Sequence, residues 1–154
     1  MRLEIDEARR RFTRARVLRL ATTDEGGQPH IVPATFALDG ERVVTAVDDK
    51  PKRHQDLRRL HNIRAHPGVS LLVDHYEEDW RRLWWVRADG RARVLPDESA
   101  ADRERAVERL VEKYPQYTER PPRGPVIAID VVRWTGWAFT DGPDDRPAHG
   151  PTEG

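Results

Sequence analysis

The 154-residue chain contains no cysteine. Disulfide scaffolds, thiolate catalysis, zinc sites built on cysteine and cysteine-ligated iron–sulfur clusters are therefore excluded. The six histidines are scattered along the chain. No two of them have the i, i+4 spacing with a glutamate that helical metalloprotease sites use. We therefore expect no metal site.

Long apolar runs are also missing. No stretch approaches the ~20 apolar residues that a membrane helix needs, and the first residues, MRLEIDEARRRF, lack the apolar core of a signal peptide. The formal net charge is +0 and the pI is near 7.0, whereas a general nucleic-acid binder usually carries a basic excess. We expect a cytoplasmic protein that acts on a small molecule and contacts neither membrane nor nucleic acid.

The sequence has none of the common motifs for nucleotide binding or nucleophilic catalysis. No glycine-rich fingerprint follows a predicted strand, which argues against a doubly wound dinucleotide-binding fold. Ser70 falls within a predicted strand and Ser99 at a predicted helix start, and neither has the sequence of a nucleophile elbow. The catalytic residues are therefore unknown. Enzymes without such groups commonly use a cofactor, for which the protein supplies position and electrostatics.

Apolar periodicity indicates a mainly β chain with peripheral helices, an α+β domain. It predicts strands over residues 16–22, 30–37, 42–47, 69–76, 84–95 and 125–134, and helices over 5–14, 54–65 and 97–113. The first three strands, joined by tight turns, are expected to form an antiparallel meander. Asp6 and Asp97 are the expected helix N-caps, and Pro33 indicates an edge strand or a bulge.

This order of elements predicts a small closed or partly closed antiparallel barrel. We expect one domain over residues 1–140. Residues 141–154 are rich in proline, glycine and aspartate, which is typical of a flexible C-terminal tail.

A basic segment follows the third predicted strand, where Lys50, Lys52 and Arg53 surround Pro51. In isolation, such a run is more often a hydrated surface loop, and the neighbouring acids at 48–49 partly offset its charge. Its position immediately before a predicted helix changes the balance. A helix N-terminus offers unpaired N–H groups and the positive end of a dipole, so the segment is favoured as a phosphate site.

Five tryptophans are many for a chain of this length. Their default role is packing in the core or at a subunit interface, and a planar cofactor stacked on one of them is the less frequent alternative. They are Trp80, Trp84, Trp85, Trp134 and Trp137.

The residues from Leu18 to Tyr76 resemble a known superfamily. The pieces are "LAT…G.P…P..F..DG", "KPKR…LRR" and "P.VSLLVD", followed by "WWVRADGRARV" and a last strand that ends in tryptophan. Their order and spacing are similar to those of the split-barrel flavin-binding superfamily. It contains pyridoxamine 5′-phosphate oxidases and enzymes dependent on the deazaflavin coenzyme F420. The final pieces resemble the F420-dependent group, and the resemblance extends to about Thr140.

The resemblance implies a homodimer of six-stranded antiparallel split barrels, with two cofactor sites at the subunit interface. The cofactor phosphate would be held by Lys50, Lys52 or Arg53, and the far wall of the site would come from around Trp85 of the partner subunit. The flavin or deazaflavin ring would lie against Val32, Pro33, Thr35, Phe36, Thr45 and Ala46. Arg58 or Arg59 would meet a polyglutamate tail of the cofactor.

The implied activity is hydride transfer from F420 to an unknown small-molecule substrate. Contacts specific for pyridoxal phosphate are not evident, so pyridoxamine phosphate oxidase activity itself is not expected. One alternative is an FMN-dependent oxidoreductase of the same fold. Another is a carrier of flavin, deazaflavin or haem without catalytic activity.

Overall fold

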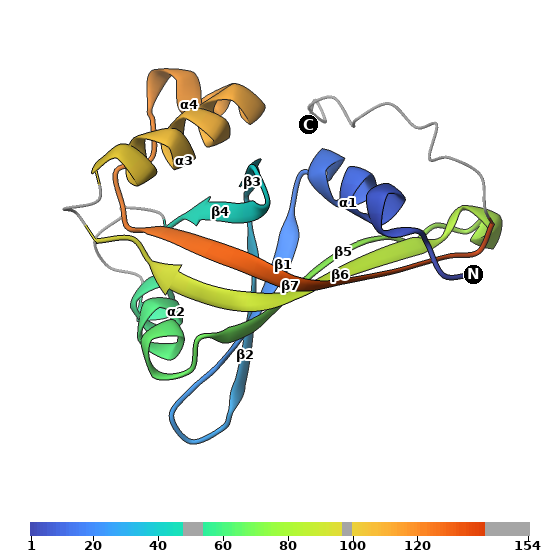
Figure 1. The fold of residues 1–154 in the computed structure, drawn as a ribbon, viewed down its shortest axis with the longest axis horizontal. Helices are drawn as coiled ribbons and strands as arrows, with labels where there is room; N and C mark the ends of the chain where they lie inside the picture. Colours follow the sequence, from blue (N-terminus) through green and yellow to red (C-terminus); the bar gives the residue numbers. More distant parts are fainter. Residues whose placement is uncertain (48–53, 97–99, 141–154) are drawn as a thin grey trace.

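A computed structural model of the chain describes residues 1–47, 54–96 and 100–140. A single antiparallel sheet of seven strands curls into a half-barrel with helices around it (Figure 1). The strands are β1 (Leu18–Thr23), β2 (Pro29–Ala34), β3 (Ala37–Asp39), β4 (Arg42–Ala46), β5 (Gly68–His75), β6 (Trp84–Val94) and β7 (Val126–Ala138). The helices are α1 (Ile5–Arg14), α2 (His54–Ala65), η1 (Trp80–Arg82), α3 (Ala100–Lys113) and α4 (Gln116–Glu119).

The strand order is β2-β1-β5-β6-β7-β4-β3, so β2 and β3 form the two edges of the sheet. The two hairpin pairings of the predicted meander are confirmed, β1 with β2 and β3 with β4, but its middle strand is divided, so the two hairpins lie at opposite edges of the sheet. Pro33 lies on the edge strand β2, as its missing N–H requires. The predicted strand 30–37 is divided at Thr35–Phe36, where the chain passes from one edge to the other. This two-residue link brings both edges together and forces the sheet to curl.

The prediction of a mainly β split barrel with peripheral helices is confirmed. The count is seven strands instead of six, because the division at Thr35–Phe36 makes two strands of one. The strand β7 is longer than predicted because it pairs with the whole of β6, from Trp84 opposite Ala138 to Val94 opposite Ile127, with an irregularity after Asp89.

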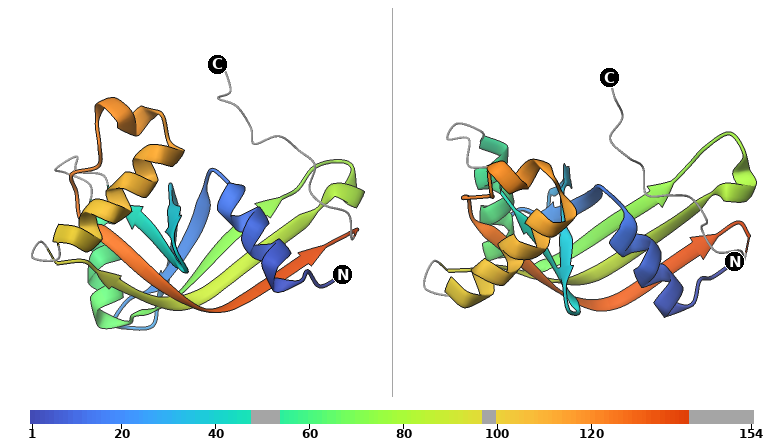
Figure 2. Two further views of the ribbon diagram at one scale, coloured as in Figure 1. Left: turned by 45° about the horizontal axis from the view of Figure 1, so that its top comes forward. Right: turned by 90° about the horizontal axis from the view of Figure 1, so that it is seen from above.

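The concave face of the sheet holds the main core, which α1 closes from one side (Figure 2). Phe12 of α1 is fully buried, and its ring centroid lies 5.1 Å from that of Phe36 and 5.0 Å from that of Trp134. Trp84 is also buried in this core. The packing role expected of the tryptophans therefore holds for these two, whereas Trp80 is 69% exposed.

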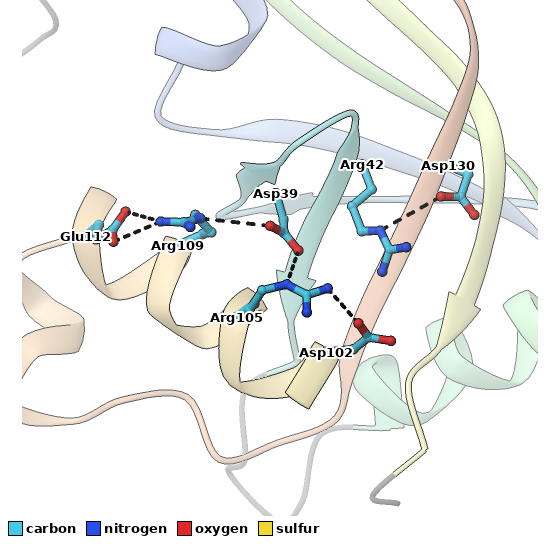
Figure 3. A network of polar contacts seen from close by, with 7 residues as sticks. All are labelled: Asp39, Arg42, Asp102, Arg105, Arg109, Glu112 and Asp130. Carbon is cyan, nitrogen blue, oxygen red and sulfur yellow. Dashed lines mark hydrogen bonds and ion pairs between the residues drawn. The ribbon is translucent and has the colours of Figure 1, made fainter. Parts of the chain in front are cut away.

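The convex face of β3 and β4 is covered by α3, which forms a second, smaller core. Ion pairs fasten the helix to the β3–β4 turn (Figure 3). Asp39 lies 3.4 Å from Arg105 and 3.9 Å from Arg109. This attachment places the C-terminal end of α3, with Lys113 and Tyr114, beside the link between the two sheet edges.

The predicted N-cap at Asp6 is wrong. The helix α1 begins at Ile5 with Glu4 in the cap position, and no side chain caps it. Asp6 and Glu7 instead lie in the first turn, where carboxylates favour the helix dipole. The predicted cap at Asp97 and the predicted tail at 141–154 lie outside the residues that the structure describes.

No helix in the described part of the chain is long and apolar enough to cross a membrane. The cytoplasmic location stays a prediction.

Candidate functional site

The basic segment with Lys50, Lys52 and Arg53 lies outside the described residues, but both of its ends are fixed. Before it, the N–H of Val47 donates to the carbonyl oxygen of Pro125 at 2.8 Å. After it, α2 begins at His54 as predicted. The segment thus connects the end of β4, the strand next to the edge strand β3, to the start of a 12-residue helix, and the phosphate role of its three cations stays a prediction.

The link between β2 and β3 is held by side chains from distant elements. The hydroxyl of Thr45 on β4 donates to the carbonyl oxygen of Thr35 at 2.7 Å. The Oγ1 atom of Thr35 and the hydroxyl of Tyr117 form a second hydrogen bond of 2.8 Å. The strand that leads into the basic segment is therefore bonded directly to the place where the sheet edges meet.

Tyr114 also holds the link between β2 and β3 by hydrogen bonds. Its hydroxyl accepts from the N–H of Phe36 at 3.0 Å and lies within donating distance of the carbonyl oxygens of Phe36, at 3.0 Å, and Arg16, at 2.9 Å. Burial raises the pKa of Tyr114 to about 12, so the phenol keeps its proton and can both donate and accept. One hydroxyl group thus forms hydrogen bonds with backbone groups of two separate segments.

Lys113 lies over the same link. Its Nζ atom is 3.6 Å from the centroid of the Phe36 ring and donates to the carbonyl oxygen of Thr13 at 3.1 Å. Arg16 in turn donates from Nη1 to the carbonyl oxygen of Lys113 at 2.8 Å. Burial, with a smaller contribution from the charge of Arg16, lowers the pKa of Lys113 to about 7.

The structure brings together part of the predicted ring site. Val32, Phe36 and Thr45 are buried on the concave side, and Thr35 joins them through Thr45. Ala46 instead packs under α3 in the second core.

Pro33 and Trp85 lie apart from this group. Pro33 is exposed and pairs with Arg19 on the edge of the sheet. Trp85 is half-buried on β6, three strands away from β2 in the sheet order. The assignment of all these residues to a cofactor stays a prediction.

A buried polar cluster lies where α2 packs against β1, beside β2. Asn62 is 1% exposed and donates from Nδ2 to the hydroxyl of Thr22 at 3.1 Å. Its Oδ1 atom and Nδ1 of His30, the residue opposite Thr22, are buried without a hydrogen-bond partner among the residues described. Such orphaned atoms are rare and call for a ligand or an ordered water. Burial, followed by the charges of Arg58 and Arg59, lowers the pKa of His30.

The outer face of β5 and β6 carries a second polar group beside Trp85. Ser70 donates to Oδ1 of Asp89 at 2.6 Å, and Nε of Arg87 donates to Oδ2 of Asp89 at 3.1 Å. The Arg87 guanidinium carbon lies 5.8 Å from the Trp85 ring centroid. These contacts hold the Arg87 guanidinium beside the Trp85 ring, on the face of the sheet that α1 does not cover.

Reasoning from the sequence missed Tyr114, Tyr117 and Lys113, which fell at the end of a predicted helix and in a predicted loop. The two tyrosines pack edge to face, with ring centroids 5.6 Å apart. An aromatic pair directly after a helix is a weak signal for tertiary packing, and nothing local indicated its partner. Within the described ranges, no three histidine, aspartate or glutamate side chains gather as metal ligands.

The chain matches a known protein family and several solved structures. Residues 5–138 match the family model described as pyridoxamine 5′-phosphate oxidase. No match was found among the curated proteins.

Several solved structures have the same fold. One is an FAD-binding protein from Mesorhizobium loti, which is 25% identical in sequence and has a TM-score of 0.67. The match covers 88% of this chain and 95% of that one. An FAD-binding protein from Mycobacterium smegmatis is 18% identical with a TM-score of 0.61, over 89% and 96% of the two chains. A conserved hypothetical protein from Mycobacterium tuberculosis is 19% identical with a TM-score of 0.72, over 99% and 95%.

Proposed function

The chain belongs to the pyridoxamine 5′-phosphate oxidase family, and we propose that within it the protein is an oxidoreductase that binds the deazaflavin coenzyme F420. Two similar structures are described as FAD-binding proteins, which supports a cofactor of flavin type. The preference for F420 rests on the resemblance of residues 84–94 and of the last strand to F420-dependent enzymes. The substrate is a small unsaturated or oxidised molecule.

The observation that carries this proposal is the junction at Thr35–Phe36. Both sheet edges meet there, and Thr45 joins the junction to the strand that leads into the basic segment. If Lys50, Lys52 or Arg53 held the cofactor phosphate at the start of α2, the rest of the cofactor would lie along these strands. The orphaned atoms of Asn62 and His30 beneath α2 offer partners for polar groups of such a molecule.

The chain's own residues have binding and orienting roles in this proposal. The bound deazaflavin supplies the chemistry, a hydride carried at its C5 atom. The backbone around Val32 and Thr35 would orient the ring, and the buried fastening by Tyr114 would keep that wall rigid. No residue is assigned as a proton donor.

We further propose that the protein is a homodimer whose site is completed by Trp85 of the partner subunit. The outer face of β2, β1, β5 and β6 supports this, since it presents Ile31, which is 63% exposed, together with half-buried Leu72 and Trp85. A second copy on this face would cover these side chains. It would also bring a second Trp85 to the sheet.

Two other functions use the same site. An FMN-dependent oxidoreductase would differ only in the cofactor that binds more tightly. A carrier of flavin, deazaflavin or haem would bind its cofactor and show no turnover. Reduced F420 mixed with the protein and a panel of candidate acceptors separates the carrier from the enzyme, because oxidation restores absorbance at about 420 nm.

The phosphate site is tested by replacing Lys50, Lys52 and Arg53 together with alanine. If these cations bind phosphate, affinity for the cofactor should fall by about 1.5–3 kcal/mol for each charged hydrogen bond lost. The control is Arg120→Ala, which removes an exposed cation elsewhere. Unchanged affinity in a triple variant that keeps its circular dichroism spectrum would contradict the phosphate assignment.

A further inference from the structure

A cavity of about 550 Å³ lies between α2 and the strand ends where β6 finishes and β7 begins. Its lining includes Ile63 and Arg64 from α2, Arg93 from β6, and Leu95 and Pro125 from the segments beyond the paired strands. Ligand pockets commonly measure ~300–1,000 Å³. The size of this cavity suits a small organic molecule.

In the described part of the lining, the charged side chains of this cavity are both cationic. Among the described residues that line it, Arg64 and Arg93 are the only charged ones, and neither makes an ion pair or hydrogen bond with any residue in the described part of the chain. Both residues are exposed, and no described carboxylate lines the cavity beside their two like charges. A bound anion would offset these charges and accept hydrogen bonds from both.

A second cavity in the molecule provides the contrast. It measures about 360 Å³ and has Asp39, Arg42, Arg105 and Asp130 in its lining. There, Arg105 lies 3.4 Å from Asp39 and Arg42 lies 4.0 Å from Asp130 (Figure 3). Its arginines are paired with carboxylates of the protein, so we expect no preference for an anion in that cavity.

The floor of the first cavity is apolar and belongs to the packed interior. Ile63 is 2% exposed and lies in the main core, while Leu95 is 4% exposed and lies in the second core. Because both cores are closely packed, this floor is rigid. The cavity thus combines a fixed apolar surface with two cations at its rim.

We propose that this cavity is a second binding site, for an organic carboxylate with an apolar body. The carboxylate lies between Arg64 and Arg93, where guanidinium groups can bind both of its oxygens. The apolar body covers Ile63 and Leu95. This site does not depend on the proposed cofactor, and it holds whether the cofactor is F420 or FMN.

The test is an NMR titration of the ¹⁵N-labelled protein with 4-phenylbutyrate and, separately, with the neutral 4-phenylbutan-1-ol. Shift changes at the amides of Arg64 and residues 93–95 are expected, with the carboxylate binding about tenfold more tightly than the alcohol. The double variant Arg64→Ala/Arg93→Ala should bind the two ligands equally. Arg91→Ala should keep the wild-type preference, since Arg91 lies two residues away on the same strand and is not in the lining.

Three results would overturn the proposal. One is an unchanged preference for the carboxylate in the double variant, and another is a pattern of shift changes centred away from residues 63–64 and 92–96. The third is displacement of bound phenylbutyrate by one equivalent of FMN or F420, which would make the cavity part of the cofactor site. Failure of both F420 and FMN to bind would refute the proposed function and leave this titration unaffected.

Discussion

The hydroxyl of Tyr114 fastens the junction of the sheet edges, and its removal tests how the proposed ring wall is held. In Tyr114→Phe the ring remains and only the oxygen is lost. The N–H of Phe36, a residue that is 0% exposed, then has no acceptor, and the carbonyl oxygens of Phe36 and Arg16 lose the single O–H proton that lies within reach of both. A buried polar group left without its partner costs about 1–3 kcal/mol.

We therefore expect Tyr114→Phe to lower the free energy of unfolding by about 1–3 kcal/mol, measured by urea denaturation. In a domain of this size each kcal/mol corresponds to about 2–4 °C in Tm. The matched control is Tyr117→Phe, whose hydroxyl bonds, within the described part of the chain, only to the part-buried side chain of Thr35. It should cost about 1 kcal/mol or less.

The cofactor affinity of the two variants gives an independent readout. If the link forms the ring wall, Tyr114→Phe should also weaken cofactor binding, because the backbone at Thr35 and Phe36 becomes less fixed. A loss of stability within about 0.5 kcal/mol, the usual range for surface substitutions, would refute the role given to this hydroxyl.

Three further perturbations test other parts of the account. The pKa of Lys113 is about 7 in the folded chain, against 10.5 for an ordinary lysine. Between pH 7 and 10.5, the unfolded state therefore binds more protons at this residue than the folded state does. Stability should rise with pH from 7 to 10 relative to Lys113→Met, and parallel urea-denaturation profiles would contradict this. In Gly90→Ala the added Cβ would lie 2.4 Å from the carbonyl oxygen of Asp130. A loss of about 1–3 kcal/mol is expected, whereas Gly68→Ala, with nothing within 4 Å, should lose none, and equal Tm values would refute the close approach. Ile31→Glu on the outer sheet face should convert the proposed dimer to monomers in sedimentation, while Ile5→Glu on α1 should not. A wild-type monomer would contradict the dimer.

Local patterns in the sequence predicted the elements well but not their long-range pairing. Pro33 correctly indicated an edge strand, because a residue without an N–H cannot donate the hydrogen bond that an interior strand needs. Residues 30–37 read as one strand because their apolar pattern is continuous. The division at Thr35–Phe36 depends on Thr45 and Tyr114, which approach from 10 and 78 residues away, and no local pattern specifies such contacts.

The candidate site was predictable to a similar extent. The basic segment stood out because it precedes a helix, and that helix begins where periodicity placed it, at His54. The orphaned atoms of His30 and Asn62 were not predictable, since burial of a polar side chain depends on how α2 packs against the sheet. The same holds for Arg64 and Arg93, which are distant in sequence and meet only at one cavity.

The most direct test of the central claim is a pair of binding titrations with purified, cofactor-free protein. F420 and FMN are added separately, and binding is followed by quenching of intrinsic tryptophan fluorescence. The proposed function predicts saturable quenching with a lower Kd for F420 than for FMN. Binding of FMN far more tightly than F420 would contradict the cofactor assignment.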